Sequence, residues 1–391
     1  MEGLVKREVL SRRVRAVKPS GIRKFFDIAA NMKDVISLGV GEPDFVTPDH
    51  IRQAGIAALE RGETHYTSNL GMPPLREAIA GLIEGRYGVR YDPATEIMVT
   101  VGVSEAVDVA MRALLDEGDE VIIPDPGYVA YEADVVFAGG KVVPAITSPA
   151  NDFRVTAEEI AAVLTPRTKV ILLGNPNNPT GAVIEREELE KIAALARQHD
   201  LIVLSDEVYS RLVYGREHVS IASLPGMRER TILTDGFSKA YAMTGWRVGY
   251  VCAPHHILEG MLKVHQYAIM CAPTMSQEAA LEAILHGEEH VRAMVASYDE
   301  RRKLMVAGFN SIGLECYEPF GAFYTFPSIK RTGLTSDEFA EKLLLEEHVA
   351  VVPGNAFGSA GEGFVRCAYC TAKDQIEEAI TRIGRFVEKH S

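Results

Sequence analysis

Reactive side chains in this sequence stand shortly after apolar runs. Asp206 follows the run at residues 201–204, and Lys239 follows the run at residues 231–234 across a few small and polar residues. An asparagine-rich loop at residues 175–181 follows a third apolar run. Taken singly, an acid near a helix start, a solvated lysine and a proline-containing turn are ordinary features. Their shared position after apolar runs is the reason to consider them together.

The chemistry of these side chains becomes specific if the apolar runs are strands of one parallel sheet. Ligands bind beyond the carboxyl ends of such strands, where Asp206, Lys239, an amide from the 175–181 loop and Arg247 would meet. An acid, an amine, an amide and a guanidinium form a charge-balanced polar pocket on rigid elements. Such a pocket suits an anionic, ring-bearing cofactor that carries a phosphate.

The pattern of apolar runs indicates which elements position these side chains. Short apolar runs alternate with amphipathic stretches through the middle of the chain, which favours strands alternating with helices. We expect helices at residues 105–115 and 186–198, and strands at residues 97–101, 121–124, 169–173, 201–204, 231–234 and 247–251. This alternation predicts an α/β fold with a mostly parallel sheet that is covered on both faces.

The last third of the chain has a different character. Long helical stretches cover about residues 255–310, and short strands near residues 322–326, 350–353 and 364–368 precede a C-terminal helix. This mixture predicts a smaller α+β domain.

The length of the chain agrees with two domains. A chain of 391 residues is too long for one small core. We expect a large domain at residues 46–290, and a small domain in which residues 1–45 pack with residues 291–391.

Charge and hydropathy exclude several classes of protein. Lys and Arg together number 41 and Asp and Glu number 54, so the net charge is −13. An acidic surface repels phosphate backbones, and we therefore expect neither sequence-independent nucleic-acid binding nor binding to anionic membranes. No apolar run reaches the roughly 18 residues of a membrane helix, and the N-terminal residues lack the apolar core of a secretory signal.

The cysteines favour a reducing compartment. Five cysteines in a chain of this length are too few, and odd in number, for a disulfide framework. Cys367 and Cys370 form a C-x-x-C pair, but no second pair follows it, so we expect no metal site. The default expectation is a cytoplasmic protein.

Several motifs make the chain similar to a known family. It resembles the class I, fold type I pyridoxal-phosphate aminotransferases, in their prokaryotic aspartate and aromatic subgroup, from about residue 11 to about residue 388. The segments that carry the resemblance are LGVGEPDF, HYTSNLG, NPNNPTG, SDEVY, SKAYAMTGWRVGY and FVRCAY. The resemblance implies a seven-stranded, mostly parallel sheet between helices in the large domain, and pyridoxal 5'-phosphate as the cofactor.

The activity that this resemblance implies belongs to amino-acid metabolism and biosynthesis. An amino group moves from an L-amino acid of aspartate or aromatic type to a 2-oxo acid such as 2-oxoglutarate, by a ping-pong mechanism. The catalytic set would be Lys239, Asp206 and Tyr209. Lys239 would form the Schiff base with the cofactor aldehyde and carry the proton to and from the substrate Cα.

The resemblance also assigns the groups around the cofactor ring. Asp206 would pair with the protonated pyridine nitrogen, which lets the ring accept electrons. Asn178 and Tyr209 would hold the ring 3-oxygen, and Tyr128 would stack on the ring face.

The phosphate of the cofactor would lie at the start of a helix. Arg247 matches the phosphate arginine, and the backbone N–H groups of Val103 and Ser104 open the expected helix at residues 105–115. Many relatives have a serine three residues before the lysine, where this chain has Gly236. Ser238 is expected to substitute for it.

The remaining residues that match the family's motifs would contact the substrate or the neighbouring subunit. Arg366 would clamp the substrate α-carboxylate, with Asn178 and the backbone of Gly41 close by. Tyr66 matches a tyrosine that reaches the phosphate of the neighbouring subunit, so a homodimer with shared active sites is expected.

Three alternatives remain open at the level of sequence. The segments at residues 263–267 and 271–273 resemble N-acetyl-diaminopimelate and aromatic aminotransferases as much as aspartate ones, and no arginine for a distal carboxylate can be placed. Another reaction of the same cofactor, such as that of a β-lyase, a decarboxylase or a synthase, occurs on the same fold. A non-catalytic sensor domain is disfavoured because Lys239 is intact.

Overall fold

A seven-stranded sheet forms the centre of the larger part of the molecule. The computed structural model describes residues 8–18 and 32–391. Across the sheet the strand order is β2 (Ile97–Thr100), β8 (Gly249–Cys252), β7 (Thr231–Gly236), β6 (Ile202–Asp206), β5 (Thr168–Gly174), β3 (Glu120–Asp125) and β4 (Lys141–Ile146). All neighbouring pairs are parallel except those of β8 with β2 and β7. The α/β fold and the mostly parallel sheet are therefore confirmed.

Both faces of this sheet are buried because successive side chains of the central strands alternate between two cores. Val170, Leu172 and Leu204 lie in one core, and Ile171 and Val203 lie in the other. The first core contains residues of α5 (Gly102–Leu114), α6 (Val129–Ala138) and α10 (His255–Ala268). The second contains residues of α7 (Ala157–Val163) and α8 (Arg186–Gln198).

Strand β4 was not predicted from the sequence. It lies at the edge of the sheet and pairs only with β3. Most of its side chains are exposed or half-buried, and it contains Pro144, which an edge strand tolerates. Its residues after Lys141 are apolar, but Pro144 interrupts the run, and a proline within a run argues against a central strand.

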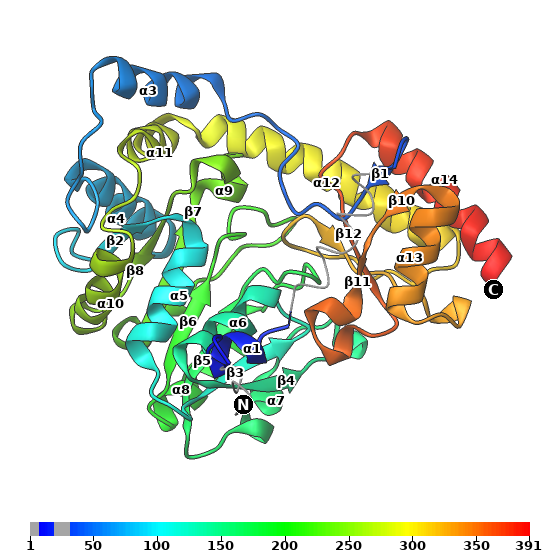
Figure 1. The fold of residues 1–391 in the computed structure, drawn as a ribbon, viewed down its shortest axis with the longest axis horizontal. Coiled ribbons are helices and arrows are strands. Elements are labelled where there is room, and N and C mark those ends of the chain that lie inside the picture. Colours follow the sequence, from blue (N-terminus) through cyan, green and yellow to red (C-terminus); the bar gives the residue numbers. More distant parts are fainter. Residues whose placement is uncertain (1–7, 19–31) are drawn as a thin grey trace, which may run out of the picture.

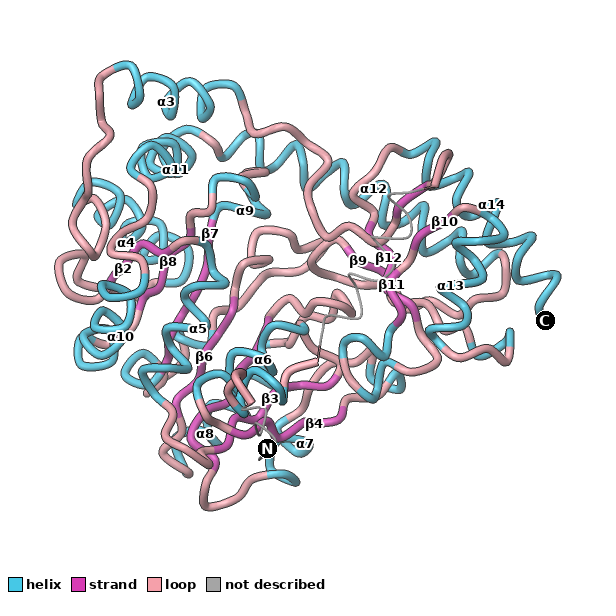
Figure 2. Tube along the Cα trace, viewed as in Figure 1, coloured by secondary structure: helices cyan, strands magenta, loops and turns pink. Residues whose placement is uncertain are grey.

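The smaller part of the molecule holds two small sheets (Figures 1 and 2). One has the order β11 (Val352–Pro353), β12 (Val365–Ala368) and β9 (Tyr324–Thr325), and the other pairs β1 (Ile36–Ser37) with β10 (Val349–Ala350). Its helices are α13 (Ser336–Glu347) and α14 (Lys373–His390). The 24-residue helix α12 (Glu288–Ser311) runs from the end of α11 toward these sheets. The domain boundaries at residues 45/46 and 290/291 remain a prediction.

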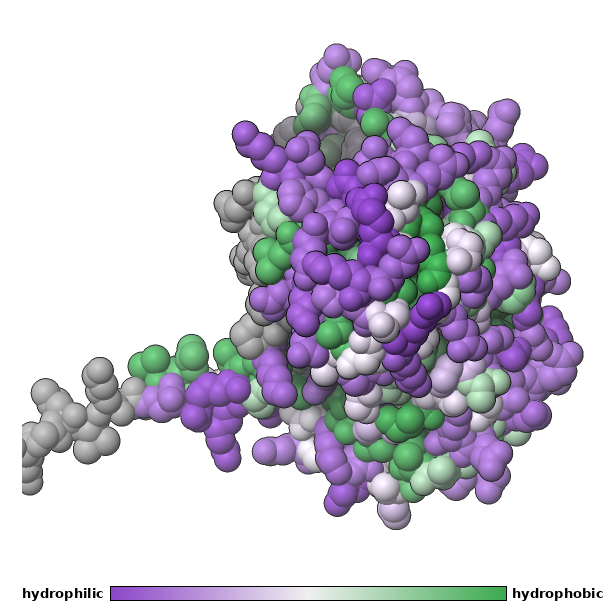
Figure 3. All heavy atoms as spheres, turned by 90° about the vertical axis from the view of Figure 1, so that its right-hand side faces the viewer, coloured by the Kyte–Doolittle hydropathy of each residue, from purple (hydrophilic) through white to green (hydrophobic). Residues whose placement is uncertain are grey.

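Five further helices lie in the described residues. They are α1 (Arg12–Ala16), α3 (Asp49–Glu60), α4 (Pro73–Tyr87), α9 (Phe237–Ala240) and α11 (Thr274–His286). Short 3₁₀ turns are η1 (Pro149–Asn151), η2 (Ile221–Ser223), η3 (Arg228–Arg230), η4 (Thr244–Trp246), η5 (Lys330–Thr332), η6 (Gly354–Phe357) and η7 (Ser359–Gly361). The segment that contains α1 projects from the body of the molecule (Figure 3). None of the described helices is long and apolar enough to cross a membrane.

Candidate active site

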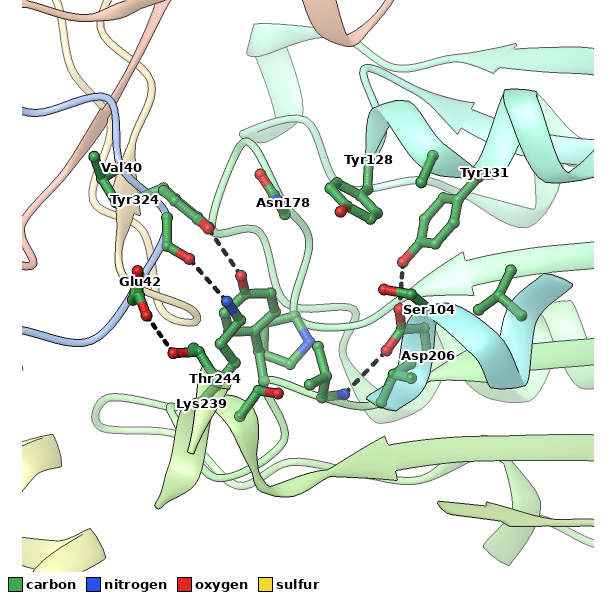
Figure 4. Close-up of a pocket in the computed structure, with 18 of the residues that line it drawn as sticks. Val40, Glu42, Ser104, Tyr128, Tyr131, Asn178, Asp206, Lys239, Thr244 and Tyr324 are labelled. Atoms are coloured by element: carbon green, nitrogen blue, oxygen red, sulfur yellow. Dashed lines mark hydrogen bonds between the residues drawn. The ribbon is translucent and has the colours of Figure 1, made fainter. Parts of the chain in front are cut away.

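A pocket of about 540 Å³ lies where the carboxyl ends of the parallel strands face the smaller part of the molecule. Three consecutive parallel strands each supply a side chain there: Asn178 after β5, Asp206 at the end of β6 and Lys239 after β7. Strand β12 supplies Arg366 from the opposite side. The other predicted site residues on the lining are Gly41, Val103, Ser104, Tyr128, Tyr209, Ser238 and Arg247. Figure 4 shows several of these side chains converging on the pocket.

Lys239 lies on the one-turn helix α9, directly after β7. Its Nζ donates a hydrogen bond of 2.8 Å to the carbonyl oxygen of Gly41. Burial lowers the pKa of Lys239 to about 8, and the nearby Arg366 and Arg247 act in the same direction. A larger fraction of this amine is therefore neutral near neutral pH than for an exposed lysine, as a nucleophile or base requires.

Asp206 is a buried carboxylate at the opposite side of the pocket (Figure 4). Its Oδ2 accepts a hydrogen bond of 2.7 Å from the Tyr131 hydroxyl, and its Oδ1 accepts one of 3.1 Å from the Val208 N–H. Burial raises the pKa of Asp206 to about 6, although these two hydrogen bonds lower it. No ion pair of Asp206 occurs within residues 8–18 and 32–391. A cationic ring nitrogen would complete its surroundings.

Arg366 is buried and is held by neutral groups. Its Nη1 donates to Asn178 Oδ1 at 2.9 Å, and its Nη2 donates to the Gly39 carbonyl oxygen at 2.7 Å. The guanidinium carbon lies 4.4 Å from the centroid of the Tyr324 ring and 4.8 Å from that of Phe357. Its Nε is buried without a partner in the described part of the chain. A buried guanidinium that forms no ion pair with any described carboxylate is suited to bind an incoming carboxylate.

The segment at residues 39–42 closes the pocket from the smaller part of the molecule. The N–H of Leu38 donates a hydrogen bond to the Ala350 carbonyl oxygen, and the Leu38 carbonyl oxygen accepts one from the Ala368 N–H. These two bonds tie the segment to β10 and β12. Gly41 has no room for a side chain, because a Cβ there would collide with the Tyr324 hydroxyl. The Tyr324 hydroxyl is in turn 2.8 Å from the Tyr209 hydroxyl.

The other end of the pocket is built from the start of α5 and from Arg247. Gly102 has φ +72°, and a Cβ on it would lie 2.6 Å from Nη2 of Arg247. A Cβ on Gly249 would lie 2.8 Å from Val103 N. These glycines let the guanidinium and the backbone of β8 approach the helix N-terminus, which is a positive end for an anion.

One detail at this end of the pocket corrects the sequence prediction. Residues 247–251 were expected to be a strand, but β8 begins at Gly249. Arg247 instead follows η4 in a left-handed conformation, φ 49°, and its Nη1 donates to the Thr244 carbonyl oxygen at 2.9 Å. This conformation turns the guanidinium toward α5. The helix expected at residues 105–115 also begins earlier, at Gly102.

Tyr66 lies outside the pocket. Its side chain is 81% exposed and belongs to the loop before α4. Hydrogen bonds connect this loop to the turn before α11: Asn69 Nδ2 donates to the Met270 carbonyl, and Thr274 Oγ1 donates to the His65 carbonyl, both at 2.7 Å.

Two tyrosines that line the pocket, Tyr131 and Tyr324, were not predicted from the sequence. Tyr131 could have been found, because it follows Tyr128 by three residues at a helix start and so lies near it on the same face. No sequence signal distinguishes Tyr324 from other strand tyrosines. Among the described residues, no group of His, Cys, Asp or Glu could hold a metal ion.

Comparison with known proteins identifies similar chains over almost the full length. The family model for aminotransferase class I and II matches residues 33–383. The chain is 49% identical to an aspartate aminotransferase of Pyrococcus abyssi, with 97% of this chain and 98% of that protein covered. It is 42% identical to a probable N-acetyl-LL-diaminopimelate aminotransferase of Bacillus subtilis, with 97% and 96% covered. The crystal structure of an aromatic aminotransferase from Pyrococcus horikoshii superposes with a TM-score of 0.90 at 46% identity, with 94% of this chain and 99% of that chain covered.

Proposed function

Because this chain belongs to the class I and II aminotransferase family, it is a pyridoxal-phosphate-dependent enzyme that transfers amino groups, and we propose that the pocket around Lys239 is its active site. The reaction moves an amino group from an amino acid to a 2-oxo acid. The observation that carries the proposal is that one pocket contains both a buried lysine of lowered pKa, Lys239, and a buried carboxylate, Asp206, that has no ion-pair partner in the described residues.

The cofactor brings an electrophilic aldehyde and a ring that takes up the electron pair left on the substrate Cα. Lys239 binds it through that aldehyde and then moves the proton at the substrate Cα. Its pKa of about 8 suits both tasks, because the neutral amine is accessible near neutral pH.

Asp206 binds the ring nitrogen and keeps it protonated. The carboxylate can do so because its two hydrogen-bond donors, Tyr131 and Val208, leave it in place without neutralising its charge. Tyr128 covers one face of the ring, and the Asn178 amide and Tyr209 hydroxyl hold the ring 3-oxygen.

Arg366 holds the substrate α-carboxylate. Its unpartnered Nε, and the stacking of its guanidinium on Tyr324, support this role. The Gly41 backbone and Asn178 lie beside the same carboxylate. Bidentate binding by a fork of this kind fixes the orientation of the Cα–H bond that must be broken.

The phosphate binds at the start of α5. The N–H groups of Val103 and Ser104, the Arg247 guanidinium and the Ser238 hydroxyl are the donors. The glycine at position 102 supports this assignment, because any larger residue would displace Arg247 from the helix start.

The active unit is a homodimer with shared sites. An exposed apolar group supports this proposal: Tyr66, Tyr267, Ile269 and Met270 are 81%, 87%, 47% and 42% exposed. The hydrogen bonds between the two loops place these residues in one region of the surface. A second copy of the chain would cover this region and bring its Tyr66 to the phosphate.

The distal part of the substrate is acidic, aromatic or of the N-acetyl-diaminopimelate type. Among the described residues, the cations that line the pocket are Lys239, Arg247 and Arg366, and each already has a role. A distal carboxylate would therefore need a cation from outside this set, such as one from the second subunit. A panel of amino donors with 2-oxoglutarate decides between the classes.

The cellular location is proposed to be the cytoplasm. All five cysteines are free, and three of them, Cys252, Cys316 and Cys367, are buried, as suits a reducing compartment.

A half-reaction tests the proposed activity against the other chemistries of the cofactor. Holoenzyme incubated with one amino donor and no 2-oxo acid should release one equivalent of the corresponding 2-oxo acid per site and then stop, leaving the cofactor aminated. Continuous release of ammonia or carbon dioxide would instead indicate a lyase or decarboxylase.

A further inference from the structure

A buried histidine supports the start of the helix that is proposed to bind the phosphate. His265 lies on α10 and is completely buried, with 0% of its side chain exposed. Its Nδ1 is 2.6 Å from Oε1 of Glu105, which lies in the first turn of α5. Because an ionised carboxylate only accepts hydrogen bonds, His265 is the donor. The two helices pack on each other through the core that covers one face of the sheet.

Glu105 connects this histidine to the helix start. Its other oxygen, Oε2, accepts a hydrogen bond of 2.5 Å from the N–H of Val101, the residue that precedes the helix. An acid in the first turn that bonds back to the residue before the helix satisfies one of the N–H groups that a helix N-terminus leaves unpaired. Val103 and Ser104, which follow Gly102 in the first turn of α5, line the pocket. The N–H groups of a first turn have no partner within their own helix.

The orientation of Glu105 matters because a carboxylate and a phosphate compete for the same donors. Both are anions, and both bind free N–H groups at a helix N-terminus. A Glu105 side chain that was free to turn could occupy these groups or repel the phosphate. In the observed geometry, one carboxylate oxygen is held by His265 and the other by Val101.

The second ring nitrogen of His265 supports this assignment. Nε2 is buried and has no hydrogen-bond partner in the described residues. A buried N–H without an acceptor is costly, so the proton is assigned to Nδ1, where it meets the carboxylate. A polar residue kept in a fully buried position with one unsatisfied nitrogen is not explained by packing alone.

We propose that His265 is a positioning residue for cofactor binding: through Glu105 it keeps the N–H groups at the start of α5 free for the phosphate. The inference rests on the proposed binding of the phosphate at this helix. It concerns affinity for the phosphate group, and it assigns His265 no contact with the cofactor.

The test compares two ligands that differ only in the phosphate. Apoprotein of the full chain is titrated with pyridoxal 5'-phosphate and with pyridoxal, and the ratio of the two affinities is measured. His265→Leu should lower the affinity for pyridoxal 5'-phosphate by about 10- to 100-fold, the effect of losing one hydrogen bond to a charged group, and leave that for pyridoxal within about 2-fold. His265→Asn, which has the same branched arrangement of heavy atoms as Leu, should restore the ratio, because its amide nitrogen stands at the position of the imidazole Nδ1 and can donate to Glu105.

A double-mutant cycle determines whether His265 acts through Glu105. In a Glu105→Ala background the His265→Leu change should no longer alter the affinity ratio. His256→Leu is the matched control, since His256 is an exposed residue on the same helix and should leave the ratio unchanged.

The outcomes separate this inference from the proposed site. If the wild-type protein bound both ligands equally, the phosphate site itself would be wrong. If it preferred pyridoxal 5'-phosphate but His265→Leu and His265→Asn both kept the wild-type ratio, or both lost it equally, the positioning role would be overturned. Should the Leu variant not fold, the Asn variant and the Glu105→Ala protein still give the comparison. Glu105→Ala removes the competing carboxylate, so its ratio should stay at or above the wild-type value, and a lowered ratio would overturn the positioning role.

Discussion

The Tyr131 hydroxyl donates a 2.7 Å hydrogen bond to Oδ2 of Asp206, and both side chains lie on the same side of the pocket (Figure 4). A buried carboxylate without a cation would otherwise be largely protonated close to neutral pH. This hydrogen bond favours the charged form and opposes the burial that raises the pKa of Asp206 to about 6. Tyr131 thus helps to keep the charge that the ring nitrogen requires.

Tyr131→Phe should shift the pH dependence of cofactor binding. Loss of the hydrogen bond raises the pKa of Asp206 further above 6, so the carboxylate is protonated over a wider range. Affinity for the cofactor, measured from pH 5 to pH 8.5 by titration of apoprotein, should therefore begin to fall at a higher pH than in the wild type. Tyr87→Phe is the control, because it removes a buried tyrosine hydroxyl at a position that does not line this pocket. An identical pH midpoint in both variants would contradict the role of Tyr131.

Asp206→Ala should separate cofactor binding from turnover. The proposed phosphate donors stay in place, so the purified variant should retain much of its cofactor. Turnover should fall by about 100-fold or more, because the ring loses the counter-charge that makes it an electron acceptor. Cofactor content is measured by absorbance after release in alkali, and turnover is measured with saturating donor. A variant with near-normal turnover would rule out the proposed pairing with the ring nitrogen.

The sequence predicts most of the pocket because its key groups follow strands. Asp206, Lys239 and the loop with Asn178 each come after an apolar run that forms a parallel strand, and parallel strands end at one edge. Arg366 was found from its motif.

Contacts between distant segments could not be predicted in this way. His265 meets Glu105 across 160 residues, and Tyr324 meets Tyr209 across 115. Their side chains have no periodicity or spacing that encodes the contact, which depends on how helices and the small sheet pack on the finished fold.

Lys239→Ala should abolish catalysis while leaving the phosphate contacts intact. The covalent attachment and the proton carrier are lost together, so we expect a fall in turnover of at least ~10³-fold. In the wild type, borohydride reduction should fix the cofactor covalently to the peptide that contains Lys239, as mass spectrometry of a digest would show. Label on a different lysine would disprove the assignment.

Arg366→Lys should weaken substrate binding far more than cofactor binding. A lysine ammonium is a point charge and cannot reproduce the two parallel hydrogen bonds of a guanidinium to a carboxylate. The variant also loses the hydrogen bonds that Arg366 donates to Asn178 and Gly39. We expect KM for the amino donor to rise by about 10- to 100-fold. Arg385→Lys is the control, because Arg385 forms an exposed ion pair with Glu347 on the surface. Equal kinetics in the two variants would remove Arg366 from the substrate site.

Subunit mixing tests whether Tyr66 serves the neighbouring site. Tyr66→Phe and Arg247→Ala should each lower activity at limiting cofactor. If sites are shared, a dimer of one Tyr66→Phe chain and one Arg247→Ala chain has one site with both groups intact and one site with neither. Equal mixtures that have exchanged subunits should therefore regain activity above the average of the two variants.

A second mixture contains the same two substitutions in a different arrangement. When the chain that carries both Tyr66→Phe and Arg247→Ala pairs with wild type, shared sites leave each site of the mixed dimer with one defect, so mixing should lower activity below the average of the parents. Sites built within a single chain reverse both results: the single variants would not complement, and the wild-type chain would keep one intact site in every mixed dimer. Subunit exchange is verified by native mass spectrometry of the mixtures, so that a lack of complementation reflects the architecture of the site.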